Sequence, residues 1–328
     1  MFYLNSKIKA MLTTHPVERQ YLSWVYSSLW HRERLYRKVN LGDSNKDKRI
    51  LIIRPSVSDE VQGLMSLFIQ ALRWIDYADR MNFIPFVDFM NFKTQYYVKN
   101  ENAWTFFFQQ VSDLTFVDVY SSKNVDITGV TKKIVLNESL FKENIFTDNY
   151  SLYAAKKIID KYIRYSDEIN NRLFAEENEL NIRNCIGVYI RGTDYVALKP
   201  TGEFVQPSIS QVIAIVDKYL ECYQNCKLFL VTEDYRYFKI LKRKYKDQLL
   251  TVSFDTFIEN YDGKNFLSKA NVLNNDVKKR GQDYLIKIIL LSKCRFLISS
   301  MTMGSIAAYA LNGGRYQSTH IFNLGKYK

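Results

Sequence analysis

The second half of the chain repeatedly places a short apolar segment directly before a polar turn. Each apolar segment predicts a buried strand, and the polar residues after it are expected at the strand's carboxyl end. Three strand and turn pairs follow this pattern: 186–190 with 191–194, 228–231 with 232–234, and 296–299 with 300–305. The carboxyl ends of parallel strands share one sheet edge, where ligands bind, so the chemistry is expected at that edge.

Segments with helical periodicity separate these strands. Helices are predicted at 208–223, 235–245, 281–292 and 305–311, and further strands at 250–254 and 320–324. Alternation this regular predicts a Rossmann-like domain built on a parallel sheet.

The first half shows the same order more briefly. A strand at 49–53 leads into a helix at 63–81, and a strand at 84–88 follows at once. The right-handed crossover of such a unit implies a second parallel sheet. Residues 151–180 predict one long helix, and we expect the boundary between the two lobes after it.

The length of 328 residues is enough for two hydrophobic cores, and we expect divisions at 1–45, 46–178 and 179–328. Residues 89–124 are aromatic and irregular. Core packing explains most of these aromatic side chains, and the alternative is an aromatic wall for a sugar acceptor.

The formal net charge of +12 favours anionic partners, namely nucleic acid, a membrane surface or a phosphorylated substrate. Basic residues are spread along the chain and no zinc-finger or RNA-recognition signature occurs, which argues against nucleic acid. The N-terminal segment mixes basic residues such as Arg19, Arg32 and Arg37 with Tyr21 and Trp30. It predicts either a helix at an anionic membrane interface or an amphipathic helix packed on its own domain.

The sequence shows neither a metal-binding motif nor a secretory signal. Four cysteines and three histidines show no metal-ligand spacing, so a metal-independent mechanism is expected. The first residues lack a secretory signal and no apolar run is long enough to span a membrane. A cytoplasmic location is therefore predicted.

The glycine-rich signatures of dinucleotide-binding enzymes and nucleotide triphosphatases are absent. The turn at 300–305 instead precedes a helix that begins with small residues. The backbone N–H groups at the start of that helix favour binding of a phosphate. Ser300, Thr302 and Ser305 add hydroxyl donors there. Arg191 directly follows a strand, and its planar, charged guanidinium is suited to binding a diphosphate. The alternative is a purely structural ion pair with Asp194.

The remaining acids at strand ends have structural alternatives. Thr232, Glu233 and Asp234 fit either a donor site or the cap and first turn of a helix. Asp283 either caps the helix predicted at 281–292 or accepts hydrogen bonds from a nucleotide.

These residues together resemble a known family. Residues 187–194, GVYIRGTD, resemble the His-x-Arg-x-Thr/Gly-Asp motif of the GDP-fucose-dependent fucosyltransferase superfamily, which includes nodulation, core α1,6- and protein O-fucosyltransferases. The strand 229–231 followed by Thr232, Glu233 and Asp234 is similar to the family's strand followed by Thr-Asp-Asp. Residues 280–300 resemble its helix and final strand before a Ser/Thr loop.

The resemblance implies a GT-B fold with two facing Rossmann-like domains, an acceptor-side domain at 46–178 and a nucleotide-sugar-binding domain at 179–328. It implies that Arg191 grips the diphosphate of GDP-fucose, with Ser300 and Thr302 near it, and that Asp283 reads guanine. Tyr189, Thr232 and Asp234 fall in the same donor-site motifs. The expected reaction is inverting and requires neither metal nor cofactor.

The sequence also departs from the family pattern. Tyr189 replaces a histidine, Gly192 a frequent second arginine, and Glu233 an aspartate. Asp283 lies about one helical turn before the family's acid, where Lys287 stands. The segment 58–63 replaces the glycine loop of the first lobe.

The sequence therefore predicts a fucosyltransferase that acts on a surface polysaccharide or oligosaccharide precursor, with a glycan acceptor that is free or lipid-linked. Its basic N-terminus suits peripheral contact with the inner membrane face. Asp194, Glu233 and Asp59 are the candidate general bases. Two alternatives remain, a GT-B transferase for another nucleotide sugar and a non-enzymatic basic protein that binds glycans or nucleic acid.

Overall fold

The structure is a computed structural model and describes residues 16–55, 62–131, 136, 140–267 and 276–328. Two separate sheets form its framework. The first has the order β1-β4-β2-β3, with β1 (Arg37–Val39), β2 (Ile50–Ile53), β3 (Ile84–Val87) and β4 (Val125–Ile127). The second has the order β7-β6-β5-β8-β9, with β5 (Cys185–Tyr189), β6 (Lys227–Val231), β7 (Leu249–Leu250), β8 (Phe296–Ser300) and β9 (Ser318–Phe322).

The second sheet is parallel throughout, as the sequence predicts. In the first sheet β2 pairs in parallel with β3 and β4, whereas β1 runs antiparallel to β4. The pairing of Arg37 with Ile127 brings the segment before β1 to the carboxyl edge of this sheet. The segment predicted to be helical at 1–45 therefore also supplies a strand.

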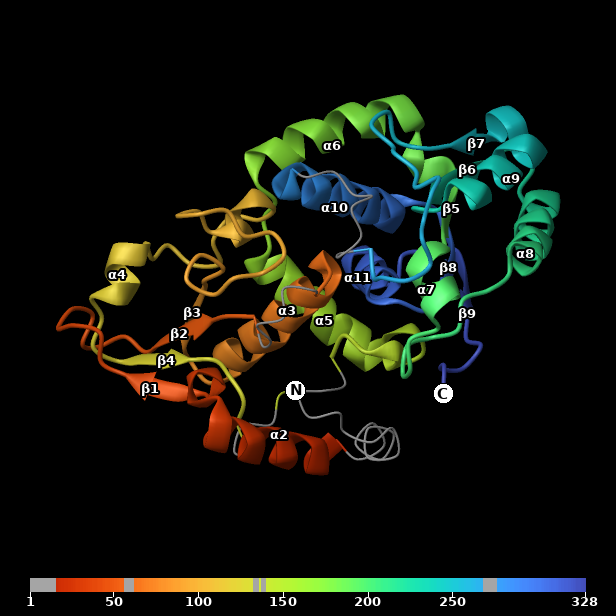
Figure 1. The fold of residues 1–328 in the computed structure, drawn as a ribbon. Helices are drawn as coiled ribbons and strands as arrows, with labels where there is room; N and C mark the ends of the chain where they lie inside the picture. Colours follow the sequence, from red (N-terminus) through yellow and green to blue (C-terminus); the bar gives the residue numbers. More distant parts are fainter. Residues whose placement is uncertain (1–15, 56–61, 132–135, 137–139, 268–275) are drawn as a thin grey trace.

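Helices pack between and around the sheets (Figure 1). They are α2 (Pro16–Trp30), α3 (Leu64–Arg80), α4 (Phe116–Tyr120), α5 (Asn149–Tyr162), α6 (Asp167–Leu180), α7 (Thr193–Leu198), α8 (Ile209–Cys222), α9 (Tyr235–Tyr245), α10 (Val277–Lys293) and α11 (Met303–Asn312). Short 3-10 helices are η1 (Arg32–Arg34), η2 (Ala103–Phe106), η3 (Glu143–Phe146), η4 (Ile182–Asn184) and η5 (Lys246–Gln248).

One continuous apolar core connects the two sheets. Figure 1 shows α3, α5, α10 and α11 between the first sheet at the left and the second at the right. Buried side chains of these four helices belong to a single hydrophobic cluster, which includes Ile75, Leu152, Leu285 and Ile306. The lobes are thus joined by packed helices, and burial of this apolar surface stabilises their arrangement.

The aromatic stretch at 89–124 contributes to this core. Trp104, Phe107 and Phe108 are almost completely buried, and Phe108 stacks on Phe68 with ring centroids 4.9 Å apart. Core packing, the first of the two interpretations of this stretch, accounts for these rings.

The long helix predicted at 151–180 is wrong, because the chain forms α5 and α6 with a break between them. The break pairs with an earlier segment: the N–H of Gln109 donates to Arg164 O at 2.8 Å, and Tyr165 forms a bridge with Phe108. This non-local pairing holds the backbone extended, and it explains why helical periodicity alone misses the break.

Two other boundaries differ from the sequence prediction by more than two residues. The strand predicted at 250–254 is only the two-residue β7, and the helix predicted at 281–292 begins four residues earlier, at Val277. Asp276 caps this helix by accepting the N–H of Lys279 at 2.9 Å. The interpretation of Asp283 as a helix cap is therefore wrong.

Candidate functional site

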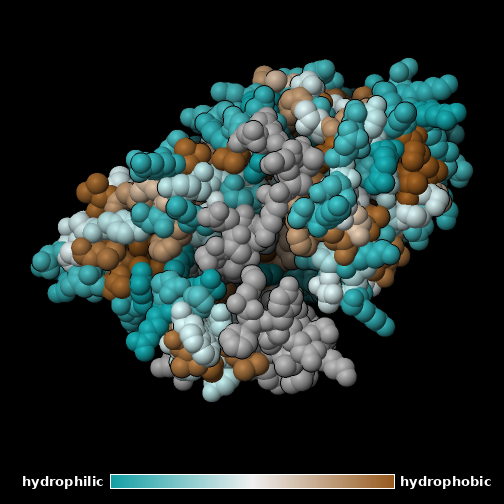
Figure 2. Space-filling model, in the orientation of Figure 1, coloured by the Kyte–Doolittle hydropathy of each residue, from teal (hydrophilic) through white to brown (hydrophobic). Residues whose placement is uncertain are grey.

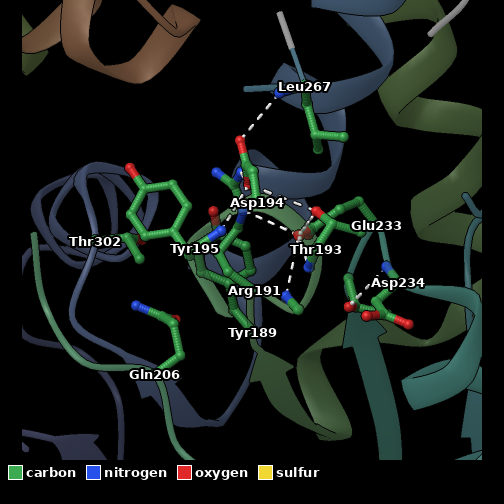
Figure 3. Close-up of polar contacts among 12 residues, drawn as sticks. Tyr189, Arg191, Thr193, Asp194, Tyr195, Gln206, Glu233, Asp234, Leu267 and Thr302 are labelled. Carbon is green, nitrogen blue, oxygen red and sulfur yellow. Dashed lines mark hydrogen bonds and ion pairs between the residues drawn. The ribbon is translucent and has the colours of Figure 1, made fainter. Parts of the chain in front are cut away.

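The polar residues that follow β5, β6 and β8 meet at one edge of the second sheet (Figure 3). Arg191 and Asp194 follow β5, Glu233 follows β6, and Thr302 follows β8. Because β5 lies between β6 and β8, residues separated by more than 100 positions in the sequence become neighbours. The prediction of a single polar sheet edge is confirmed.

The guanidinium of Arg191 is held by two carboxylates. Its Nε donates to Glu233 Oε1 at 3.2 Å and its Nη2 donates to Asp194 Oδ1 at 2.8 Å. Its Cζ lies 4.5 Å from the ring centroid of Tyr195. Nη1 donates to no described residue, so one face of the fork remains for a ligand.

The carboxylates of Glu233 and Asp194 keep Arg191 positively charged. Burial opposes the charge, but Glu233 and Asp194 together raise the pKa of Arg191 well above its ordinary value. The side chain still has 21% of its surface exposed. A permanently charged and oriented guanidinium at a sheet edge is suited to a diphosphate.

Glu233 and Asp194 also bind backbone groups. Glu233 Oε1 accepts the N–H of Gly192 at 3.0 Å and the hydroxyl of Thr193 at 2.9 Å. The second Asp194 oxygen accepts the N–H of Leu267 at 3.2 Å. These bonds fix both carboxylates in place, an arrangement that suits holding Arg191 better than taking a proton. Asp59, the third candidate base, lies outside the described residues.

Gly192 stands where a second arginine is frequent in the family, and its surroundings explain the glycine. A Cβ at this position would lie 2.4 Å from Asp234 Oδ2. Asp234 is buried, caps α9 by accepting the N–H of Arg236 at 2.8 Å, and donates its own N–H to Thr232 Oγ1 at 3.3 Å. Thr232 and Asp234 thus form the turn beneath Gly192.

The start of α11 offers a second set of donors. Thr302 caps this helix by accepting the N–H of Ser305 at 3.2 Å, and the Ser305 hydroxyl lies 2.7 Å from that of Ser299. Ser300 is fully buried, and its hydroxyl has no hydrogen-bond partner among the described residues. A buried hydroxyl without a partner beside a helix N-terminus is suited to an anionic oxygen.

Tyr189, which replaces the family's histidine, lies beneath α11. Its side chain is 1% exposed and its hydroxyl lies 2.9 Å from that of Tyr284. A Cβ at Gly304 would lie 2.6 Å from both hydroxyls, so the glycine lets α11 approach the two rings. The structure places Tyr189 in the floor of the site.

Asp283 lies apart from Arg191, on the face of α10 that contacts α6. It forms an ion pair with Arg172, and one turn later Lys287 forms an ion pair with Asp255. Burial raises the pKa of Asp255, and its second oxygen has no partner among the described residues. The position of the family's acid is thus occupied here by a lysine whose charge is neutralised.

A cleft of about 530 Å³ lies nearby, between α6, α10 and the segment after β7. Its lining includes Arg172, Glu176, Phe254 and Lys278. None of the residues predicted for the donor site lines it.

Glu203 is a further acid near Arg191 that sequence patterns do not indicate. The loop that carries it pairs with the C-terminal segment: the N–H of Tyr327 donates to Glu203 O at 2.9 Å, and the N–H of Val205 donates to Gly325 O at 2.9 Å. Its side chain is exposed and bonds to no described residue. Although the residue as a whole is exposed, partial loss of water around its carboxyl group raises the pKa of Glu203, and the charges of Arg191 and Lys326 oppose the shift.

The part of the chain that the structure describes offers neither a metal site nor a membrane-spanning helix. It contains no group of three histidine, cysteine, aspartate or glutamate side chains arranged to hold a metal ion. None of the described helices combines the length and apolar character needed to cross a membrane.

Comparison with solved structures identifies the fold. The structure of POFUT1 in complex with GDP matches with a TM-score of 0.51 and 9% identity, over 86% of this chain and 100% of that one. NodZ α-1,6-fucosyltransferase soaked with GDP-fucose matches with a TM-score of 0.49 and 16% identity, over 80% and 93%. NodZ from Bradyrhizobium gives 0.48 and 16%, over 80% and 92%.

No protein-family model matches the sequence, and no curated protein matches it either. The likeness to POFUT1 shows that the chain has the α/β fold predicted for it, the GT-B arrangement of two sheets with their covering helices.

Proposed function

We propose that the chain is a glycosyltransferase that transfers fucose from GDP-fucose to a hydroxyl of a glycan, with inversion at the anomeric carbon. The observation that carries the proposal is the Arg191 guanidinium, fixed by Glu233 and Asp194 at the carboxyl edge of the second sheet. The fold is that of POFUT1, whose solved structure holds GDP. The motif resemblance in residues 187–194 points to the same donor.

The donor diphosphate is proposed to lie between Arg191 and the start of α11. Nη1 of Arg191 and the unpartnered hydroxyl of Ser300 are donors that the described residues leave unused. In the reaction, the acceptor oxygen attacks the anomeric carbon as the bond from that carbon to the phosphate oxygen breaks. GDP leaves with the electron pair, and Arg191 stabilises its developing charge.

Glu203 is proposed as the general base that takes the proton of the acceptor hydroxyl. A base must be free to accept a proton and works best with a pKa nearer the working pH. Glu203 meets both conditions, since it has no bond to a described residue and its pKa is raised. Asp194 and Glu233, in contrast, are engaged with Arg191 and are proposed to position it.

The reaction is proposed to need no metal ion or other cofactor. Arg191 supplies the positive charge that a metal ion would supply to the leaving diphosphate. Transfer that persists at full rate in excess EDTA is the expected result, and loss of activity that Mg²⁺ or Mn²⁺ restores would contradict it.

The acceptor is proposed to be a polysaccharide or oligosaccharide precursor at the inner, cytoplasmic face of a membrane. The helix α2 supports this, because Leu29 and Trp30 are 62% and 66% exposed and the basic segment of η1 follows directly. Figure 2 shows apolar atoms among polar ones at the lower edge of the molecule, where α2 lies. Aromatic and basic side chains together favour an anionic interface.

Thermal unfolding with and without nucleotides tests the donor. A ligand at about one hundred times its dissociation constant adds about 2.7 kcal/mol of stability. We expect GDP and GDP-fucose to stabilise the wild type and to lose this effect in Arg191→Ala, while UDP and CMP have none. Transfer from radiolabelled GDP-fucose to a panel of glycans then tests catalysis.

One observation favours a second candidate, a transferase for another nucleotide sugar. Lys287 and its partner Asp255 occupy the position of the family's guanine-reading acid. Stabilisation by UDP-sugars or GDP-mannose but not by GDP-fucose is the result that this candidate predicts. If no nucleotide stabilises the chain, the remaining alternative is a basic protein that binds glycans or nucleic acid without catalysis.

A further inference from the structure

A buried amide oxygen without a hydrogen-bond partner lies in the loop between α7 and α8. It belongs to Gln206, which is 7% exposed. The side-chain Nε2 donates to Phe204 O at 2.9 Å, whereas Oε1 has no partner among the described residues. Buried polar atoms are ordinarily hydrogen-bonded, so this oxygen requires a donor that no described residue supplies.

The unpartnered end of this amide is the oxygen and not the nitrogen. A backbone carbonyl can only accept a hydrogen bond, so the group that faces Phe204 O is the NH₂ of Gln206. Rotation of the amide would place two acceptor oxygens against each other. The ligand group that Oε1 lacks is therefore an O–H or N–H donor.

The loop that carries Gln206 is held beside β9. The N–H of Val205 donates to Gly325 O at 2.9 Å, and the backbone N–H of Gln206 donates to the Tyr327 hydroxyl at 3.4 Å. Gly325 and Tyr327 belong to the segment that follows β9, and β9 is the neighbour of β8 in the sheet. Gln206 therefore lies at the same sheet edge as the start of α11.

Strand order also gives the side of Arg191 on which Gln206 lies. Arg191 follows β5, which lies between β6 and β8. Glu233 follows β6, whereas Thr302 follows β8. Figure 3 shows the same division, with Thr302 and Gln206 on one side of Arg191 and Glu233 on the other. Gln206 thus lies beside one end of the diphosphate that is proposed to lie between Arg191 and α11.

The chemistry of Oε1 indicates which part of the donor lies at that end. Phosphate oxygens are anionic acceptors, so they repel an amide oxygen and do not supply the missing donor. The same loop carries Glu203, the proposed base, which has to lie near the sugar carbon that the acceptor attacks. A hydroxyl of the sugar on the diphosphate is therefore the O–H group that fits Gln206.

We propose that Gln206 is a specificity-determining residue of the donor site, and that its Oε1 accepts a hydrogen bond from one hydroxyl of the transferred sugar. This inference rests on the proposed transferase function and specifies how the site distinguishes a nucleotide sugar from the bare nucleotide. The carbonyl of Phe204 orients the amide, and the segment after β9 fixes the loop that carries it.

A purely structural role explains only half of this amide. The bond from Nε2 to Phe204 O stabilises the turn of the loop. It does not explain the buried oxygen, because an unpaired acceptor is unfavourable and an apolar side chain would fill the same space without that cost.

Calorimetric titration of the full chain with GDP and with GDP-fucose tests the proposal in Gln206→Met. Methionine keeps the length of the side chain and removes the acceptor. We expect the Kd for GDP-fucose to rise about three- to tenfold, the loss of one neutral hydrogen bond, while GDP binds as it does to the wild type. An unchanged Kd for GDP-fucose, or an equal rise for both ligands, overturns the inference.

Tyr327→Phe is the matched control for disturbance of the loop. It removes the hydroxyl that accepts the backbone N–H of Gln206 and leaves the side-chain amide in place. We expect the ratio of the two Kd values to remain that of the wild type. An equal change of this ratio in Tyr327→Phe and Gln206→Met would mean that the shape of the loop, and not Oε1, determines affinity for the sugar.

Analogues of GDP-fucose that lack the hydroxyl at C2, C3 or C4 identify the contact. For the analogue without the hydroxyl bound by Gln206, we expect wild type and Gln206→Met to bind equally well, because each change removes the same hydrogen bond. If the variant weakens every analogue as much as it weakens GDP-fucose, Gln206 binds no hydroxyl of the sugar and the inference is wrong.

The outcomes also separate this inference from the proposed function. If GDP-fucose does not bind, but Gln206→Met weakens GDP-mannose relative to GDP or UDP-galactose relative to UDP, the inference stands and fucose is the wrong sugar. If GDP and GDP-fucose bind and the variant weakens both equally, the inference is wrong and the donor site stands. Absence of binding by any of these nucleotides contradicts both.

Discussion

Glu233 accepts the Nε–H of Arg191 at 3.2 Å, although the two residues lie 42 positions apart. The same Glu233 oxygen accepts the Gly192 N–H at 3.0 Å, so one carboxylate fixes both the charge and the turn that carries it. This relationship sets the direction in which the guanidinium can meet a ligand.

Arg191→Lys is expected to abolish most activity without unfolding the protein. A lysine keeps the charge but cannot bond Glu233, Asp194 and a diphosphate in one plane. We expect kcat to fall by about 100-fold or more, as for loss of one transition-state donor. Steady-state kinetics with GDP-fucose measures the effect.

Arg236→Lys provides the matched control for that change. Arg236 also pairs with an aspartate after a strand, but its side chain is 67% exposed and lies at the cap of α9. Wild-type kinetics are expected for this variant. An equal loss in both would mean that the charge pattern, and not the Arg191 fork, determines activity.

Gly192→Ala is expected to destabilise the fold by about 1–3 kcal/mol, since its Cβ would meet the buried Asp234 at 2.4 Å. Urea unfolding measures the change. Gly63→Ala is the control, because nothing lies within 4 Å of a Cβ there and its φ is −64°. A neutral Gly192→Ala variant would show that the turn can move away from Asp234.

Glu203→Gln is expected to lower kcat/KM by about 100- to 10,000-fold, the usual contribution of a general base. The wild-type pH profile should show an acid limb above the ordinary glutamate range, because the pKa of Glu203 is raised. This limb should be absent in the variant. A variant that keeps both its rate and its acid limb would exclude Glu203 as the base.

Glu203→Gln is expected to lower activity but not stability. A carboxyl group whose pKa is raised by folding contributes stability below its unfolded pKa, and that contribution is lost as the pH rises through the folded value. Above that folded value the charged Glu203 therefore disfavours the fold, and Glu203→Gln should there be at least as stable as the wild type. A clear fall in Tm at pH 7 would indicate a structural role.

Ser300→Ala and Thr302→Ala are expected to separate ligand binding from helix capping. The Ser300 hydroxyl has no partner among the described residues, so its removal should leave unfolding unchanged and weaken GDP binding about three- to tenfold. Thr302 caps α11, so its alanine variant should lose about 1 kcal/mol of stability and Thr302→Ser should restore it.

Calorimetric titration with GDP and thermal unfolding measure these two effects. If Ser300→Ala destabilises the fold and leaves GDP binding unchanged, its hydroxyl belongs to the core and not to the donor site.

The order of strands, turns and helices in the second lobe follows from the amino-acid sequence. Buried strands are apolar runs, and the polar turns after them follow from the chain direction, so the sequence pattern is sufficient to place Arg191, Glu233 and Thr302 at one sheet edge. The caps at Asp234 and Thr302 are equally local, because a cap bonds backbone groups two or three residues away.

The tertiary structure decides which charged side chains from distant segments form pairs. Asp283 pairs with Arg172, 111 positions away, and the C-terminal segment near Tyr327 holds the loop of Glu203. Pairing with Phe108 breaks the helix predicted at 151–180. Periodicity and capping act over a few residues, whereas ion pairs and strand pairing act between segments that only folding brings together.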